Sequence, residues 1–321
     1  MKLVRLMITI LSLLSLPVMA DEPYPNRSIS LIAANPPGGA SDINARILTE
    51  PWSSVLKQPV VVVNRPGAGG AIGAAQVATS KPDGYTLLLA LSSVIVSPEA
   101  EIVSRRKPLY ELNQLEPIAL LSSDPMIVVV RADSPYKTMD DLLKAAKEKP
   151  DTITYSSSGN FGPIHLSVEM LAFQAGVKFA QIPFGGGGPS MIALLGGQVD
   201  FTTAAPSVAA QQIAAGKIRP LAVSSAKRLA AFPDVPTYKD LGFNTEYYIW
   251  AGLYAPSATP PAVVKTLRES IQKAVANPQY IDAMKKAGIL IDYRDAPEFK
   301  RFAYEDGQRM LKVIRAIGKI D

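Results

Sequence analysis

The sequence predicts an α/β protein with mainly parallel sheets and two domains. Short runs of β-branched and apolar residues alternate along the chain with longer segments in which apolar residues recur at helical spacing. This alternation is typical of parallel sheets whose strands are joined by helices. The chain has 321 residues, a length that suits two domains of ordinary size with well-buried cores.

The predicted strands are short apolar runs, several of which lead directly into turns rich in glycine, serine or proline. They comprise residues 28–34, 60–64, 86–91, 126–130, 152–156, 199–202 and 221–224. Helical patterns separate most of these runs, so we expect the strands to pair mainly in parallel.

The predicted helices carry recognisable start and stop signals. Gly176 follows one helical pattern at the position where a left-handed residue ends a helix. Prolines open the three patterns nearest the carboxyl end, because the first helical turn tolerates a residue without an N–H group. The expected helices comprise residues 43–57, 140–149, 164–175, 259–276, 278–288 and 297–314.

The first twenty residues predict a secretory signal peptide. Lys2 and Arg5 precede an apolar run over residues 6–16, and small residues end the segment at Ala20. The run is too short for a membrane span of about 20 apolar residues, and Asp21 directly follows the segment. We therefore expect removal of residues 1–20 and a soluble periplasmic protein. The alternative is an uncleaved membrane anchor.

Composition excludes several classes of site. The absence of cysteine excludes disulfides, thiol catalysis and cysteine-bound metal. His165 is the one histidine, which disfavours a histidine-based zinc site and a serine–histidine–acid triad. The net charge of +5 falls by two when the leader is removed, and this is too weak to indicate nucleic acid. We expect no metal and no cofactor.

Four predicted strands run into glycine- or serine-rich turns that lead into a helix start. These turns comprise residues 35–42, 157–163, 184–190 and 203–207. Glycine lets the backbone approach a ligand closely, and the exposed N–H groups at a helix start favour an anion. Any one turn is more simply a strand–helix connection. Together, the four predict a carboxylate pocket that needs no charged side chain.

Other glycine-rich segments match no nucleotide-binding motif. The segment 67–73 resembles a dinucleotide fingerprint, but Ile72 stands where the third glycine is required. The segment 185–188 lacks the Lys-Ser/Thr of a phosphate-binding loop.

His165 lies in the first turn of its predicted helix, where we expect a structural role or a hydrogen bond to the neighbouring loop. Trp250 could line a ligand pocket or belong to the core.

An ordered series of motifs resembles the solute-binding receptors of tripartite tricarboxylate transporters, often called Bug receptors. The series spans nearly all of the chain after the leader. It comprises residues 36–42 with Arg46, 62–70 with Gly73, 82–88, 155–159 with 165–166, 183–184 with 186–189, 194–200, and 250–256.

The resemblance implies a two-lobed periplasmic-binding-protein clamshell of type II. Each lobe would be a doubly wound, mainly parallel sheet with flanking helices. By analogy, residues 21–122 and 225–321 form the first lobe, and residues 123–224 form the second. The implied function is capture of a small organic acid, either a di- or tricarboxylate or an aromatic carboxylate. The implied partners are membrane permease subunits, and we expect a monomer.

The resemblance also assigns ligand-binding residues. The carboxylate would meet the first glycine turn, formed by Pro37, Gly38, Gly39, Ala40, Ser41 and Asp42, and turns of the second lobe with Ser157, Ser158, Gly159, Phe184, Gly185, Gly186 and Gly187. Asp42 would orient the turn, because like charges repel. Asn35, Ser92, Ser93, Asn160 and Thr203 could meet a distal polar group of the solute, and Phe161 or Phe184 an aromatic ring. His165 and Ala204 complete the candidates.

Departures from the family pattern limit the choice of solute. Ala33 and Ala34 precede Asn35. In relatives the segment before the first glycine turn is more apolar and aromatic. Residues 202–205 are Thr-Thr-Ala-Ala, where many relatives carry an acidic residue and an asparagine. Fewer polar groups there disfavour an amino-acid solute.

Two further functions remain open. An exported hydrolase would use Ser157 or Ser158 as its nucleophile, although no base pattern surrounds the lone histidine. A sensory co-receptor for a membrane signalling protein would use the same clamshell as a transport receptor.

Overall fold

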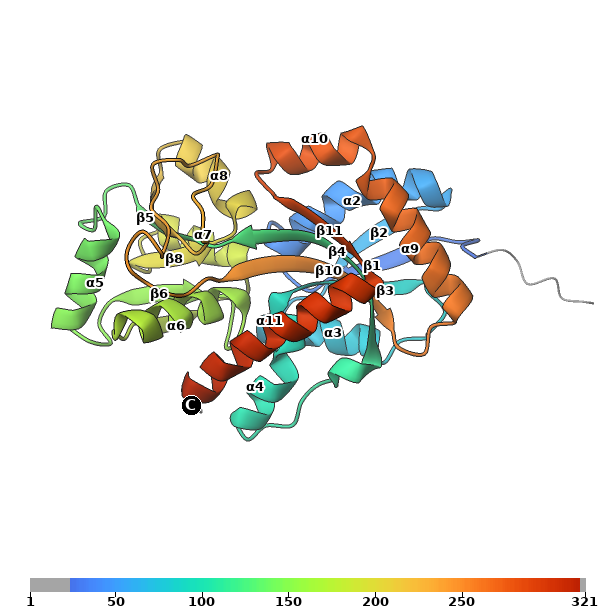
Figure 1. Ribbon diagram of the computed structural model, residues 1–321, viewed down its shortest axis with the longest axis horizontal. Coiled ribbons are helices and arrows are strands. Elements are labelled where there is room, and N and C mark those ends of the chain that lie inside the picture. Colours follow the sequence, from blue (N-terminus) through green and yellow to red (C-terminus); the bar gives the residue numbers. More distant parts are fainter. Residues whose placement is uncertain (1–23, 318–321) are drawn as a thin grey trace, which may run out of the picture.

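The computed structural model describes residues 24–317, which form two β-sheets with helices on both faces of each (Figure 1). The predicted signal peptide lies outside the described residues. Within residues 24–317, no helix is both long and apolar enough to cross a membrane.

The first sheet has six strands in the order β11-β4-β10-β3-β1-β2. Its strands are β1 (Ile29–Ala33), β2 (Val60–Asn64), β3 (Thr86–Leu91), β4 (Leu115–Pro125), β10 (Tyr248–Pro256) and β11 (Ile291–Asp295). Strand β1 pairs in parallel with β2 and β3, whereas β10 is antiparallel to both β3 and β4. Strand β11 is antiparallel to β4 at the edge.

The second sheet has five strands in the order β7-β6-β8-β5-β9. Its strands are β5 (Ile127–Arg131), β6 (Thr154–Ser157), β7 (Ala180–Pro183), β8 (Phe201–Ala204) and β9 (Ile218–Val223). Strand β6 is parallel to β7 and β8, while β5 is antiparallel to β8 and β9.

The predicted α/β fold is confirmed, but the expectation of mainly parallel sheets was wrong. Each sheet joins a parallel part to an antiparallel part. The reason is that the chain passes from one sheet to the other and back. Strands β4 and β10, which lead out of and into the first sheet, therefore run in opposite directions side by side.

The helices cover both faces of both sheets (Figure 1). They are α2 (Ala40–Leu56), α3 (Ala71–Ala78), α4 (Ser97–Val103), α5 (Met139–Glu148), α6 (Pro163–Ala175), α7 (Gly187–Leu195), α8 (Pro206–Ala214), α9 (Pro261–Val275), α10 (Pro278–Lys286) and α11 (Ala296–Ile317). Short 3₁₀ turns are η1 (Ala68–Gly70), η2 (Ser92–Ile95) and η3 (Leu112–Gln114).

The cores follow this layering. Helices α2, α9 and α10 bury Trp52, Ile271 and Tyr280 against one face of the first sheet, and α3, α4 and α11 cover its other face. Helices α5 and α6 cover one face of the second sheet, and α7 and α8 the other. We call each sheet with its covering helices a lobe.

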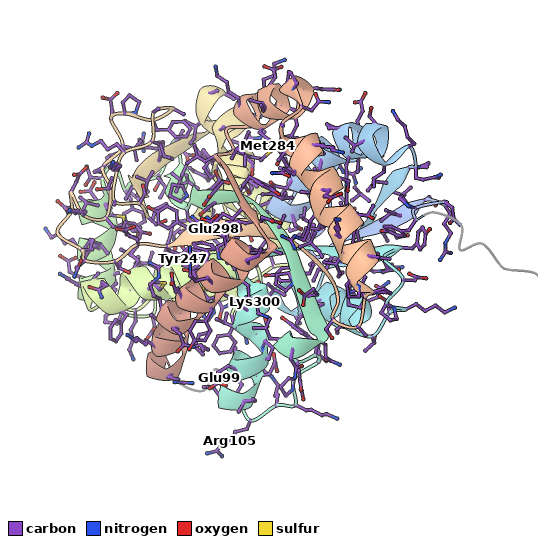
Figure 2. All side chains as sticks on the ribbon, turned by 45° about the vertical axis from the view of Figure 1, so that its right-hand side comes forward. Glu99, Arg105, Tyr247, Met284, Glu298 and Lys300 are labelled. Carbon is purple, nitrogen blue, oxygen red and sulfur yellow. The ribbon has the colours of Figure 1, made fainter. Side chains whose placement is uncertain are left out.

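Helix α11 lies against α4, where Arg315 donates to Glu99 at 3.0 Å, and Figure 2 shows Glu99 beside this helix. Apolar residues of α11 share a buried cluster with Leu166 and Met170 of α6. The carboxyl-terminal helix of the first lobe thus also contacts the second lobe. Arg105 is exposed and projects from the surface (Figure 2).

The two chain crossings between the lobes are tied together at Ser224. Its N–H donates to the carbonyl of Met126 at 2.9 Å, and its hydroxyl accepts from the Met126 N–H at 2.8 Å and donates to the Tyr247 carbonyl. The Tyr247 N–H donates back to the Ser224 carbonyl at 2.9 Å. These bonds hold the crossings side by side below the space between the lobes.

Candidate functional site

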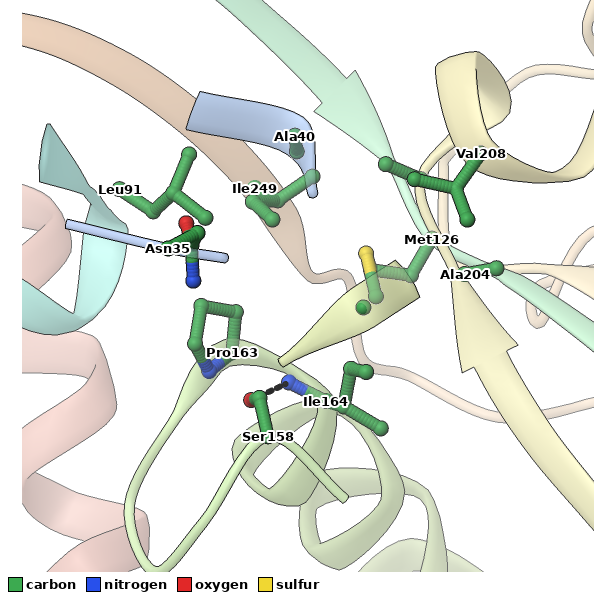
Figure 3. Close-up of a pocket in the computed structure, with 12 residues that line it drawn as sticks. Asn35, Ala40, Leu91, Met126, Ser158, Pro163, Ile164, Ala204, Val208 and Ile249 are labelled. Carbon is green, nitrogen blue, oxygen red and sulfur yellow. Dashed lines mark hydrogen bonds between the residues drawn. The ribbon is translucent and has the colours of Figure 1, made fainter. Parts of the chain in front are cut away.

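A small cavity of about 20 Å³ lies between the two lobes (Figure 3). It is lined by Asn35, Ala40, Leu91, Met126, Ser158, Pro163, Ile164, Gly187, Ala204, Ala205, Val208 and Ile249. Both lobes and the crossing at Met126 contribute to this wall. The cavity lies where strands β1, β3, β6 and β8 end, the usual place for a ligand in a doubly wound sheet.

Four helices begin at this cavity, namely α2, α6, α7 and α8. The first N–H groups of a helix have no partner inside that helix and attract an anion. Helices α6 and α8 begin at Pro163 and Pro206, which have no N–H. Helices α2 and α7 begin at Ala40 and Gly187, which have one. Helices α2 and α7, one from each lobe, therefore keep an N–H group at the first helical position.

Asp42 holds the turn before α2 in shape. Its carboxylate accepts hydrogen bonds from the Gly38 N–H at 3.0 Å, from Arg46 Nε at 3.0 Å and from Asn64 Nδ2 at 2.8 Å. Burial favours the neutral acid, but these bonds outweigh it and hold the pKa of Asp42 below its usual range. Asp42 is therefore ionised, and Arg46 balances its charge within the turn. Such a carboxylate suits the orienting role expected for Asp42.

Asn35 connects this turn to the cavity. Its side-chain oxygen accepts from the Ser41 hydroxyl at 2.7 Å, and its carbonyl accepts from Asn64 at 2.9 Å. With the oxygen held by Ser41, the amide nitrogen points into the cavity (Figure 3). Asn35 can therefore donate a hydrogen bond to a ligand there.

Ser158 and His165 stabilise the turn before α6. The Ser158 hydroxyl accepts from the Ile164 N–H at 3.3 Å, and the His165 Nδ1 atom accepts from the Phe161 N–H at 2.9 Å. Burial lowers the pKa of His165 to about 4, so the ring is neutral near pH 7. Its Nε2 atom lies 3.9 Å from Glu169 Oε1. His165 is buried and supports the turn without lining the cavity.

Glycine loops of the two lobes touch above the cavity. A β-carbon on Gly186 would lie 2.6 Å from Pro36 Cδ, and one on Gly69 would lie 3.1 Å from the backbone of Gly162. Both glycines also adopt positive φ angles, of 149° and 63°, which other residues rarely adopt. The structure is thus a closed arrangement that depends on glycine at these contacts.

No group of three or more His, Cys, Asp or Glu side chains is placed to bind a metal ion anywhere in residues 24–317. The residues that line the cavity, within the same described part of the chain, carry no ionisable side chain. The site therefore offers backbone N–H groups, one amide and one hydroxyl among apolar side chains.

Comparison with known proteins identifies the family. Residues 44–319 match the model of the tripartite tricarboxylate transporter family receptor. The chain belongs to this family. A protein from the gbd 5′ region of Cupriavidus necator is 36% identical over 96% of this chain and 93% of its own length.

Two solved structures share the fold. The periplasmic binding protein BugD is 33% identical, with a TM-score of 0.86 over 92% of this chain and all of its own. MatC from Rhodopseudomonas palustris, solved with bound malate, is 26% identical, with a TM-score of 0.85 over 91% of this chain and 100% of its own. The two-lobed periplasmic-binding-protein fold implied by the resemblance is therefore confirmed, and membership of a receptor family implies a non-enzymatic role.

The cavity wall includes some of the residues named from the sequence. Asn35, Ala40, Ser158 and Ala204 line the cavity. Pro37, Gly38, Gly39, Ser41 and Asp42 form the turn behind Asn35 and Ala40, and Gly186 precedes α7. Ser93 lines a small adjoining cavity and donates to the Gly69 carbonyl at 2.8 Å.

Other named residues lie outside the cavity wall. Ser157, Phe161, His165 and Thr203 are buried behind it, and Ser92 pairs with the hydroxyl of buried Tyr247 at 3.2 Å. Gly159 and Asn160 lie at the contact with Gly69. Phe184 packs against the core of the second lobe, and Gly185 is exposed. Trp250 is a core residue whose indole N–H donates to Asp306 at 2.7 Å.

Sequence reasoning missed most of the apolar wall. Pro163, Gly187 and Ala205 lie in the predicted turns, and the missed residues are Leu91, Met126, Ile164, Val208 and Ile249. The predicted strand 86–91 ends at Leu91, which is a usable signal because ligands bind at strand carboxyl ends. Met126 and Ile249 lie near the lobe crossings, and in sequence they are indistinguishable from core residues.

Proposed function

We propose that this protein captures a small organic acid, a di- or tricarboxylate or an aromatic carboxylate, between its lobes and delivers it to the membrane permease subunits of a tripartite tricarboxylate transporter. The observation that carries the proposal is the meeting of the α2 and α7 starts, one from each lobe, at one cavity. Such N–H groups bind a carboxylate without a counter-charge.

Family membership supports this proposal, since the matching model describes a transporter receptor. MatC, which has a similar structure, was solved with malate, a carboxylate, bound to it. The hydrolase alternative lacks support in residues 24–317: Ser157 Oγ accepts from Gln181 at 2.7 Å, Ser158 Oγ accepts from Ile164, and neither bonds to His165.

The proposal includes export and lobe boundaries. Residues 1–20 would direct the chain to the periplasm and be removed near Ala20, and the receptor would act as a monomer. Residues 21–122 with 225–321 would move as one lobe and residues 123–224 as the other. The bonds between Met126, Ser224 and Tyr247 support a hinge near those boundaries.

Ligand binding would close the lobes by population shift. A carboxylate that meets both α2 and α7 stabilises the closed form more than the open form, which presents the two helix starts separately.

A calorimetric titration tests the proposed function. We expect at least one organic acid from a panel of mono-, di- and tricarboxylates to bind with about 1:1 stoichiometry and micromolar affinity, near −8 kcal/mol. Mass spectrometry of the recovered acid should show the acid unchanged. Conversion of the acid at a useful rate would contradict the receptor role.

A second measurement separates transport from sensing. Uptake of the labelled acid should require both this protein and the permease subunits when they are produced together in a host that lacks them. Uptake that is unaffected by removing this protein would instead favour the sensory role.

A further inference from the structure

We propose that Phe161 is the apolar latch of this receptor: its ring packs into the first lobe when the second lobe closes, and it thereby stabilises the solute-bound form. The inference rests on the proposed function, because it assigns a closing contact to the same receptor. It is carried by the position of Phe161, a residue of the second lobe that is buried in a core of the first.

The turn that carries Phe161 lies against the first lobe. This turn joins β6 to α6, and it approaches Gly69 of η1 closely. A β-carbon on Gly69 would lie 3.1 Å from the Gly162 nitrogen and 3.2 Å from the Asn160 carbonyl oxygen. A β-carbon on Gly159 would lie 3.4 Å from the Gly69 nitrogen. The residues on both sides of Phe161 therefore meet the other lobe.

The side chain of Phe161 is buried in a core formed mainly by the first lobe. It is 2% exposed and belongs to an apolar cluster that includes Val94, Trp250 and Phe299 of that lobe. Residues of α6 complete the cluster. Of the described buried residues, those that form the two clusters of the second sheet and its helices do not include Phe161. The ring is thus part of the core of the opposite lobe.

The backbone of Phe161 adopts a conformation that is rare for a bulky residue. Its φ angle is 56°, in the left-handed region. The His165 Nδ1 atom accepts from the Phe161 N–H at 2.9 Å, and the two rings pack edge to face with centroids 5.7 Å apart. Strained residues persist where their surroundings fix them, and they cluster at ligand clamps and switch regions. His165 therefore fixes the direction in which the Phe161 ring leaves the turn.

Phe161 is coupled to the solute cavity through its own turn. Ser158 of this turn and Ile164 of the following helix line the cavity, whereas Phe161 is absent from the described residues that do so. Separation of the lobes would withdraw the turn from η1 and bring the ring toward water. This costs free energy in proportion to the apolar area exposed. The ring thus favours the closed form, which a solute that touches both lobes also selects.

This role differs in its consequences from that of a residue in the cavity wall. A side chain that touches the solute changes the affinities for different acids unequally. A residue that acts through closure weakens the binding of every acid by the same factor, because it changes an equilibrium common to all of them. The loss should appear in the dissociation rate, since the solute enters the open form, in which the ring does not contact the first lobe.

Truncation of the ring with a matched control tests the inference. Phe161→Ala should weaken the binding of every acid that the wild type binds by at least about tenfold, or 1.4 kcal/mol, with factors that agree within about twofold. The control is Phe179→Ala, because Phe179 is 7% exposed and packs against Phe201 inside the second lobe. The control should be less stable in urea and bind the acids as wild type does.

A milder pair keeps the test independent of folding. Phe161→Leu retains a large apolar side chain and should lose about threefold in affinity, whereas Phe179→Leu should lose none. Circular dichroism checks that each variant is folded, and stopped-flow mixing should place the loss of the Phe161 variants in the dissociation rate.

The outcomes separate the inference from the proposed function. Wild-type affinity in the Phe161 variants, or equal losses in the Phe179 variants, would overturn the inference and leave the proposed function standing. Losses that differ among the acids would also overturn it, because they would assign Phe161 to a contact with the solute. Failure of every acid to bind the wild type would overturn the proposed function, and the inference with it.

A distance measurement checks closure directly. The chain contains no cysteine, so Lys147→Cys on α5 and Lys273→Cys on α9 can carry a pair of spin labels. Both positions are exposed, and the two helices lie at opposite ends of the molecule (Figure 1). At a saturating concentration of the acid, Phe161→Ala should keep a larger population at the acid-free distances than Phe179→Ala. Equal distance distributions in the two variants would show that the ring does not act on closure.

Discussion

At the scale of single residues, the site depends on groups that hold turns in place. Asp42 and Asn64 bind the turn before α2, and His165 binds the turn before α6. Asp42 and His165 were named from the sequence, and Asp42 was expected to orient its turn. Sequence could not show which hydrogen bonds they make, because Asn64 reaches Asp42 from another strand and the local bonds to Gly38 and Phe161 depend on the shape of each turn.

The neutral state of His165 gives a prediction about binding. A buried histidine with a pKa near 4 stays uncharged between about pH 6 and 8. Affinity for a carboxylate should therefore change little over that range, in wild type and in His165→Gln. A steep fall of wild-type affinity with rising pH, absent from the variant, would show that an imidazolium binds the solute.

The same group affects stability in acid. The pKa of His165 is about 4 in the folded state and near 6.5 in the unfolded state, so the unfolded chain binds more protons between these values. The contribution of His165 to the free energy of unfolding therefore falls as pH drops from 6.5 to 4, by at most about 1.4 kcal/mol per pH unit. His165→Gln should remove this part of the pH dependence of unfolding measured with urea. Parallel pH profiles for variant and wild type would contradict it.

Asp124 gives the opposite pH dependence. It is buried at the end of β4, accepts from the Leu290 N–H at 2.7 Å, and burial raises its pKa to about 7. Because the folded pKa exceeds the usual value of 3.8, stability from this group is present at low pH and is lost as pH rises toward 7. Asp124→Asn keeps an acceptor for Leu290 and avoids the buried charge.

We expect Asp124→Asn to be more stable than wild type by about 1–3 kcal/mol at pH 8, with the difference shrinking toward pH 4. Urea unfolding at both pH values measures it. A variant less stable than wild type at pH 8 would mean that the carboxylate is stabilised by a partner other than Leu290.

At the scale of elements, sequence reasoning found the regular helices and the shorter parallel strands. The predicted strands 60–64 and 86–91 coincide with β2 and β3, and the helix ending at Gly176 with α6. It missed β10, which contains Gly252, a residue unfavourable to strands. The structure explains this glycine, because a β-carbon there would collide with the Phe299 ring. Helix α7 was predicted only as a helix start at the turn 184–190, because two glycines open it.

Contacts between loops of the two lobes predict a variant that weakens closure. Gly186→Ala places a methyl group against Pro36 at the lobe contact and strains a positive φ. Affinity for the solute should fall about tenfold or more, since closure and binding are coupled.

The matched control is Gly185→Ala, because a β-carbon on Gly185 meets nothing within 4 Å. This variant should bind as wild type does, by calorimetry. Equal losses in both variants would assign the effect to general loop disturbance and contradict a specific role for the Gly186 contact.

At the scale of the whole molecule, the alternation of strands and helices was sufficient for the α/β class. The mixed strand directions were not predictable from local pattern, because they follow from the double passage of the chain between lobes. The four helix starts named from the sequence meet at one cavity, because strand–helix turns are local, and their binding of an anion stays a prediction. Its apolar wall was not, since Leu91, Met126 and Ile249 become neighbours only when the lobes meet.

The most direct test of this account is a crystal structure of the complex with the tightest-binding acid. We predict that the carboxylate oxygens lie within hydrogen-bond distance of the first-turn N–H groups of α2 and α7, at Ala40 and Gly187, with the lobes closed. An acid bound away from these helix starts, or bound to one lobe while the lobes stay open, would contradict it.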